Sequence, residues 1–166
     1  MNTFTTNHLS GLTLRPARHD DQTAIAQLYH ACRTDLHALP MPTGMIANLI
    51  AQQQQIQAHG LAQQYPNAQT QVLAQGEQIL ARIIFDTGAN DIRLIDIMVL
   101  PMVQRHGLAR KLIQYLQQQA ADLQLPLRLN VMQDNPGAIA LYLSCGFQIS
   151  QQDYLTQQMQ WLREAS

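Results

Sequence analysis

The chain has 166 residues, a formal net charge of −1 and only 13% charged residues, about half the share in an average soluble domain. Glutamine occurs 26 times, whereas Lys111 is the only lysine. A near-neutral chain argues against a strongly basic nucleic-acid-binding protein and against a polybasic membrane anchor. The hydrophobic share of 46% suits a folded chain, and the length predicts one domain spanning residues 1–166.

Cysteine usage and hydropathy bear on the compartment. Cys32 and Cys145 are too few for a disulfide framework, so we expect a reducing, cytoplasmic setting. Residues 1–10 are polar and show no sign of a signal peptide. No run approaches the roughly 18 apolar residues of a membrane span. No pair of Cys or His residues has a zinc-binding spacing, so we predict neither a membrane partner nor a metal.

Hydrophobic periodicity and turn residues divide the chain into alternating elements. A first alternating segment stops at Pro16, which is typical of a short strand. Asp20 or Asp21 can cap the next helix, and Pro40 and Pro42 separate it from a second one. In chain order, the pattern predicts a strand at 12–15, helices at 21–32 and 43–61, a hairpin of strands at 71–74 and 78–85, a strand at 91–100, a helix after 107, a strand at 127–132, a helix at 135–146, and strands near 149 and at 154–161.

The last helix has clear boundaries. Asn135-Pro136 is a strong start, because asparagine caps helices and proline suits the first helical position. Gly146 suits the position just beyond the end. The glutamine run at 52–55 lies within an amphipathic pattern, so we interpret it as a solvated helix face in preference to a low-complexity tract.

The order of the elements sets the fold class. Three strands in an antiparallel run are followed by a strand–helix–strand unit, which requires a parallel pair. The sequence therefore predicts an α+β domain with a mixed sheet.

The segment from Val99 to Lys111 is the strongest candidate for binding chemistry. A strand stops at Pro101, a loop follows, and a helix begins after Gly107. A helix N-terminus exposes unpaired N–H groups and the positive end of the helix dipole, so it favours a phosphate group. Gly107 and Ala109 allow the backbone to approach a ligand closely. The alternative is an ordinary strand-to-helix turn, because the segment contains neither a P-loop nor a dinucleotide fingerprint.

Two motifs in this order resemble those of the GNAT N-acetyltransferase superfamily. Gln104-x-x-Gly107-x-Ala109 matches its [Gln/Arg]-x-x-Gly-x-[Gly/Ala] signature, and the segment from Asn135 to Phe147 is similar to its N-x-x-A-x-x-L-Y-x-x-x-G-F helix. The resemblance covers about residues 12–161. It implies a mixed, mostly antiparallel sheet flanked by helices, in which two splayed parallel strands form an acyl-CoA cleft.

The resemblance implies acetyl-CoA as the cofactor. Its pantetheine arm would pair with main chain at the end of the first splayed strand, and the loop backbone would hold its pyrophosphate. Asn135 matches a position that often contacts the cofactor arm, and this role is compatible with its alternative role as a helix cap. The implied cofactor-binding residues are Met98, Val99, Leu100, Gln104, Arg105, His106, Gly107, Leu108, Ala109, Arg110 and Asn135.

The resemblance also implies a catalytic acid. Tyr142 matches the tyrosine that often protonates the departing CoA thiolate, and a phenol near that sulfur can act as the proton donor. The alternative is a helix tyrosine that packs its ring in the core.

Asp96 is an unusual residue for the middle of an apolar strand. With a period of two it would share a face with Leu94 and Met98. Since members of the family often carry an acidic residue in this strand, Asp96 is a candidate general base for the attacking amine. The alternative is a salt bridge to Arg82 or Arg93.

The resemblance also implies that the acceptor is bound largely by the first two helices and the loop between them, here about residues 29–61. Tyr29, Arg33 and Asp35 are candidate substrate-binding residues, with His37 beside them. Arg33 could bind an acceptor carboxylate and Asp35 an ammonium group. The alternative is that all are ordinary polar residues at helix ends.

The sequence thus predicts an acetyl-CoA-dependent N-acetyltransferase. It would transfer an acetyl group directly to a primary amine of a small molecule or peptide, without a nucleic-acid partner, and a homodimer is possible. One alternative is a catalytically inactive acyl-CoA-binding sensor. Another is a protein-interaction module that uses the glutamine-rich second helix.

Overall fold

The computed structural model describes residues 11–165; residues 1–10, for which we predict no signal peptide, and residue 166 lie outside it. Its seven-stranded sheet has the order β1-β2-β3-β4-β5-β7-β6. The elements are β1 (Leu12–Pro16), α1 (Gln22–Cys32), α2 (Thr34–His37), α3 (Thr43–Gln64), β2 (Gln69–Gln75), β3 (Gln78–Thr87), β4 (Ile92–Val99), α4 (Leu108–Leu123), β5 (Leu127–Met132), α5 (Pro136–Ser144), β6 (Gln148–Gln152) and β7 (Thr156–Trp161), with 3₁₀ turns at His19–Asp21 and Pro101–Val103.

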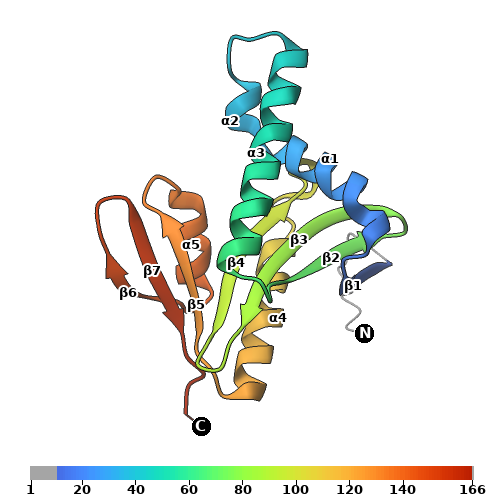
Figure 1. Ribbon diagram of the computed structural model, residues 1–166. Helices are drawn as coiled ribbons and strands as arrows, with labels where there is room; N and C mark the ends of the chain where they lie inside the picture. Colours follow the sequence, from blue (N-terminus) through green and yellow to red (C-terminus); the bar gives the residue numbers. More distant parts are fainter. Residues whose placement is uncertain (1–10, 166) are drawn as a thin grey trace.

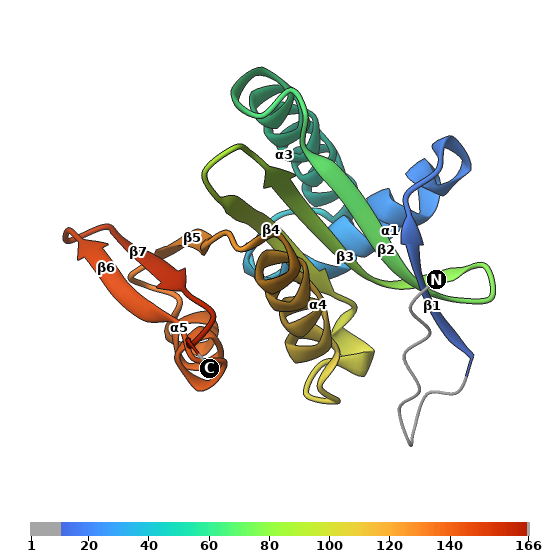
Figure 2. The same cartoon turned by 90° about the horizontal axis from the view of Figure 1, so that it is seen from below.

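The sheet is mixed, as predicted. β4 and β5 pair in parallel, and the other neighbouring strands pair in antiparallel orientation. Helices α1 and α3 lie on one face, and α4 and α5 lie on the other (Figures 1 and 2). No helix within residues 11–165 is both long enough and apolar enough to cross a membrane.

The predicted strands and helices are all present, with small differences at their ends. The structure adds the short helix α2, which the sequence pattern did not predict. Four residues complete only about one helical turn, so they carry no hydrophobic periodicity from which a helix could be inferred. Within this segment only Leu36 is buried, where it packs with Ile46 and Ile50 of α3.

Helix α4 anchors the main core. It buries one side of its surface against β3, β4 and β5, which is the result expected for apolar residues spaced three and four apart. The buried residues of α4 are Leu108, Leu112, Ile113, Leu116 and Ala120. Because α4 packs against the sheet along its length, it fixes the position at which the preceding loop ends.

A β-bulge in β4 corrects one prediction. Ile84 of β3 pairs with Asp96, whereas the next residue, Phe85, pairs with Leu94, so Ile95 is left as the extra residue. The bulge changes the alternation: Leu94 packs in the main core beneath α4, whereas Met98 packs against the clusters under α1 and α3. Asp96 therefore does not share a face with Leu94, because an extra residue reverses the alternation of side chains.

The predicted cap of the first helix is only partly confirmed. Asp21 occupies the N-cap position of α1, but its side chain makes no capping hydrogen bond. Its carboxylate instead accepts two hydrogen bonds from the Arg15 guanidinium, at 2.6 and 2.9 Å, and one from the Arg18 backbone N–H at 2.7 Å. These bonds join β1 to the start of α1.

The Arg15–Asp21 pair should make stability depend on pH in the acid range. Hydrogen bonding to Arg15 lowers the pKa of Asp21 from 3.8 to about 2. A lowered pKa in the folded state contributes stability above the unfolded value of 3.8, and that contribution is lost as the pH falls through 2. We expect urea unfolding to show a loss of about 1–2 kcal/mol between pH 5 and 2. Asp21→Asn should lower stability at pH 5 and flatten this slope, and an unchanged slope would contradict the assignment.

Candidate active site

The sheet opens between its two parallel strands. β4 pairs with β5 only at Ile92–Leu94, opposite Leu127–Leu129. Beyond these residues β4 continues beside β3 as far as Val99, and β5 continues beside β7 as far as Met132. A cavity of about 710 Å³ is lined by residues of β4, the loop before α4, the first turn of α4, and α5. The splayed strands expected from the resemblance are therefore present.

Most of the residues predicted to bind acetyl-CoA line this cavity. Lining residues that the sequence singled out are Val99, Gln104, Arg105, Gly107, Leu108, Ala109, Arg110, Asn135 and Tyr142. Further lining residues that sequence reasoning missed are Ile97, Gly137, Ala138 and Leu141. Gly137, Ala138 and Leu141 stand inside the motif that carried Asn135 and Tyr142, so the signal was present in the helical spacing of that segment.

Three predicted residues do not line the cavity. The side chain of Met98 packs under α1 and α3, on the other face of the sheet. The Leu100 backbone N–H donates to Leu80 in β3, at 2.8 Å, so this N–H is already used within the sheet. His106 is exposed, with its Nδ1 within 3.2 Å of the Val103 carbonyl and 3.0 Å of the Gln104 carbonyl.

The loop before α4 has the backbone geometry of an anion site. Gly107 is the N-cap of α4 and has a φ of +83°, a conformation that glycine adopts without strain. Arg105 also has a positive φ, of 66°. Gln104 fastens the loop to the end of β4, because its side-chain N–H donates to the Val99 carbonyl at 3.0 Å. The first N–H groups of a sixteen-residue helix thus begin at the cavity, where Arg105 and Arg110 add positive charge.

Tyr142 lines the same cavity from α5. Its ring packs against Phe147, with centroids 5.7 Å apart. Burial, together with the negative charge of Asp96, raises the pKa of the Tyr142 phenol from 10.0 to about 12. The phenol is therefore neutral and holds its proton throughout the physiological pH range. Tyr142 therefore combines ring packing, which was the alternative to a catalytic role, with a position that lines the cavity.

Asp96 is held by an ion pair on the α1–α3 face. Its carboxylate accepts a hydrogen bond from Nη2 of Arg82. Of the two partners predicted as alternatives, Arg82 is therefore the observed one, while Arg93 lies 3.6 Å from Asp91. The side chain of Asp96 is 25% exposed, and its charge acts on Tyr142 across the opening of the sheet.

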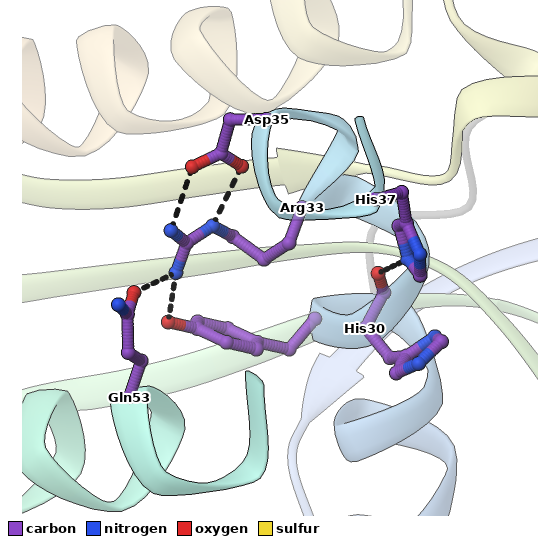
Figure 3. Close-up of polar contacts among 6 residues, drawn as sticks. His30, Arg33, Asp35, His37 and Gln53 are labelled. Carbon is purple, nitrogen blue, oxygen red and sulfur yellow. Dashed lines mark hydrogen bonds and ion pairs between the residues drawn. The ribbon is translucent and has the colours of Figure 1, made fainter. Parts of the chain in front are cut away.

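The predicted acceptor residues form one hydrogen-bonded polar cluster (Figure 3). Arg33 makes two hydrogen bonds to Asp35, at 2.9 and 2.8 Å. It also donates to the Tyr29 hydroxyl at 2.9 Å and to Gln53 of α3 at 2.6 Å. Arg33 and Asp35 thus form an ion pair, in which the Asp35 side chain is 62% exposed. The cluster joins α1 and α2 to α3. Arg33 and Asp35 lie at the end of α1 and the start of α2, where the alternative prediction placed ordinary polar residues.

His37 lies on the other side of this cluster. Its Nε2 is 2.9 Å from the His30 carbonyl, and the two imidazole rings meet edge to face with centroids 4.6 Å apart. Neither histidine lines the cavity between β4 and β5.

Comparison with known proteins identifies the family. The model of the acetyltransferase (GNAT) family matches residues 25–147, and the chain belongs to this family. No curated protein sequence matches the chain. Members of the family use acetyl-CoA, and the cavity fits that cofactor, because it combines a helix N-terminus, two arginines and a glycine that presents no side chain.

Solved structures show the same fold at low sequence identity. The PaiA N-acetyltransferase of Thermoplasma acidophilum, in complex with coenzyme A, superimposes with a TM-score of 0.70 at 13% identity, over 91% of this chain and 98% of that one. The ribosomal-protein-S18-alanine N-acetyltransferase of Escherichia coli superimposes with a TM-score of 0.66 at 22% identity, over 93% of this chain and 96% of that one. YncA of Salmonella typhimurium, with its cofactor acetyl-CoA, superimposes with a TM-score of 0.60 at 18% identity, over 95% of this chain and 96% of that one.

Proposed function

We propose that the protein is an N-acetyltransferase that transfers the acetyl group of acetyl-CoA directly to a primary amine of a small molecule or peptide. The observation that carries this proposal is that one cavity is lined both by the N-terminus of α4 and by the neutral phenol of Tyr142. The first feature suits a phosphate-bearing cofactor, and the second suits a proton donor. Among the similar structures, the E. coli enzyme is named for an alanine amine.

Acetyl-CoA supplies an activated acetyl thioester whose sulfur must leave as a thiol. In our proposal the backbone N–H groups from Gln104 to Arg110 and the Arg105 side chain hold the phosphates of the cofactor. Tyr142 keeps a proton on its hydroxyl oxygen at neutral pH and delivers it to the departing sulfur. A direct route agrees with Cys145, which within residues 11–165 has no histidine in hydrogen-bond contact and accepts a contact from Arg110 instead.

Asp96 is our candidate for the proton acceptor that keeps the attacking amine neutral. An amine is mostly protonated at pH 7, so it must lose a proton before it attacks. Asp96 is partly exposed, belongs to the splayed part of β4 and acts electrostatically on Tyr142. Since one of its oxygens is bound by Arg82, the other oxygen is the atom that would accept the proton, directly or through water.

The acceptor would approach from the side of α1 and α2. In the proposal Tyr29, Arg33 and Asp35 act by fixing the position of this wall, because Arg33 joins Tyr29, Asp35 and Gln53 in one network.

The free thiols of Cys32 and Cys145 agree with a cytoplasmic enzyme.

A panel of amines incubated with acetyl-CoA tests the proposal. We expect release of free CoA thiol with at least one primary amine, and a mass increase of one acetyl group on that amine. Acetyl-CoA should bind in calorimetry without an acceptor. Binding without turnover over a broad panel of polyamines, amino acids and peptide N-termini would support the inactive sensor. Absence of binding at millimolar cofactor would contradict both.

A further inference from the structure

A second cavity lies on the opposite side of the sheet from α4. It has a volume of about 680 Å³, within the usual range for small-molecule sites. Its walls come from the connection between β1 and α1, from α1 itself, from the second half of α3, and from β2 and β3. It shares no lining residue with the cavity between β4 and β5. Arg82, which holds Asp96, is the one lining residue that the proposed acetyl transfer involves.

Arg82 gives this cavity a buried cation. The residue is only 5% exposed, yet it lines the cavity. Within residues 11–165 its guanidinium makes one hydrogen bond, from Nη2 to Asp96, and its Nε is buried without an acceptor. A guanidinium has five N–H donors in a planar fork that matches a carboxylate, so Arg82 has donors to spare. Leaving a buried N–H unpaired is unfavourable, and an added acceptor would relieve this.

The remaining lining is positive, neutral or apolar. Arg18 and His19 are exposed and line the same cavity, whereas none of the described aspartates and glutamates does. Gln54 and Gln57 of α3 supply neutral amides, and Ile84 and Leu61 supply apolar surface. Positive charge beside apolar walls favours an anion with a hydrocarbon body over an inorganic ion.

We propose that this second cavity binds a small organic monocarboxylate, with Arg82 as the residue that binds its carboxylate. The same guanidinium also holds Asp96, so the ligand and Asp96 share one cation. Binding in the second cavity is therefore linked to the Arg82–Asp96 ion pair. Asp96 lies beside the opening of the sheet, which Tyr142 lines. Carboxylate binding at this site is separate from acetyl transfer and requires no turnover.

Calorimetry with hexanoate, in the absence of acetyl-CoA, tests the site. We expect saturable binding of hexanoate, and at least tenfold weaker binding of hexanamide, which has the same length without the charge. Inorganic phosphate should also bind at least tenfold more weakly, because it has no apolar body. Equal affinities for acid and amide, phosphate binding as tight as hexanoate, or no saturation at millimolar hexanoate would overturn the proposal.

Variants locate the binding and test the shared cation. Ala58→Phe fills the cavity from α3 and should weaken hexanoate binding at least tenfold. His59→Phe should not, because His59 is the next residue, is also exposed and does not line the cavity. Arg82→Lys keeps the charge but loses the fork and should also weaken it. Asp96→Asn removes the competing carboxylate and should tighten hexanoate severalfold. Unchanged affinity in Ala58→Phe would overturn the site, and unchanged affinity in Asp96→Asn would overturn the sharing of Arg82.

Discussion

Replacing Tyr142 by phenylalanine should lower kcat about a hundredfold and leave the affinity for acetyl-CoA nearly unchanged. The hydroxyl is the only group removed, and a positioned general acid contributes roughly 10²–10⁴-fold to rate. The ring that packs against Phe147 is kept, so the cavity wall should retain its shape. Steady-state kinetics with a responsive amine and calorimetry with acetyl-CoA measure the two effects separately.

Tyr115 provides a matched control. It is a half-buried tyrosine in α4, and its hydroxyl accepts a hydrogen bond from Gln71 at 2.9 Å, away from the cavity. Tyr115→Phe should cost about 1 kcal/mol of stability and leave kcat unchanged. If Tyr142→Phe also kept the wild-type kcat, Tyr142 would have no part in proton transfer.

The pH profile gives a second test of the same residue. The neutral phenol is the active form of an acid, and the pKa of Tyr142 is raised from 10.0 to about 12. As the pH rises through 10, Tyr142 should therefore stay protonated, and kcat should not fall there. A loss of kcat with an apparent pKa near 10, present in the wild type and absent from Tyr142→Phe, would show that the pKa of Tyr142 is not raised.

The sequence predicted the lining of the cavity between β4 and β5 more completely than the contacts of Tyr29, Arg33 and Asp35. The strand, loop and helix around Gly107 form one continuous segment, and so does the helix from Asn135 to Gly146, so local signals were sufficient there. Asn135 accepts a hydrogen bond from the Ala138 N–H, and Gly146 has a φ of +91°, as its cap and end positions require. Short-range chemistry of this kind can be read directly from spacing.

Long-range pairings and strand irregularities could not be read in that way. Ile95 bulges from β4 because of its register with β3, which no pattern within β4 alone reveals. Arg33 is charged in the sequence, but only the fold shows that it donates to Gln53, which is 20 residues away. The second cavity similarly depends on β3 and α3, which come together only in the folded chain.

Replacing Gly107 by alanine should weaken acetyl-CoA binding about tenfold or more. The cause is conformational, because a Cβ at this position would meet no atom within 4 Å, whereas the φ of +83° is unfavourable for alanine. Relief of this strain would turn the first N–H groups of α4 away from their present direction. The loss of one hydrogen bond to a charged phosphate is worth about 1.5–3 kcal/mol, which is tenfold or more in affinity.

Gly76→Ala is a control that distinguishes a loss of acetyl-CoA binding in Gly107→Ala from a loss of stability. Gly76 has a φ of +62°, lies in the turn between β2 and β3, and is equally open, with no atom within 4 Å of a Cβ. Gly76→Ala should therefore lose about as much stability as Gly107→Ala, roughly 1 kcal/mol, while binding acetyl-CoA with wild-type affinity. Equal acetyl-CoA affinities in the two variants would mean that the start of α4 does not hold the cofactor. A tenfold difference between two equally destabilised variants would assign phosphate binding to the backbone N–H groups at this helix terminus, which explains how a chain of net charge −1 can hold a polyanionic cofactor.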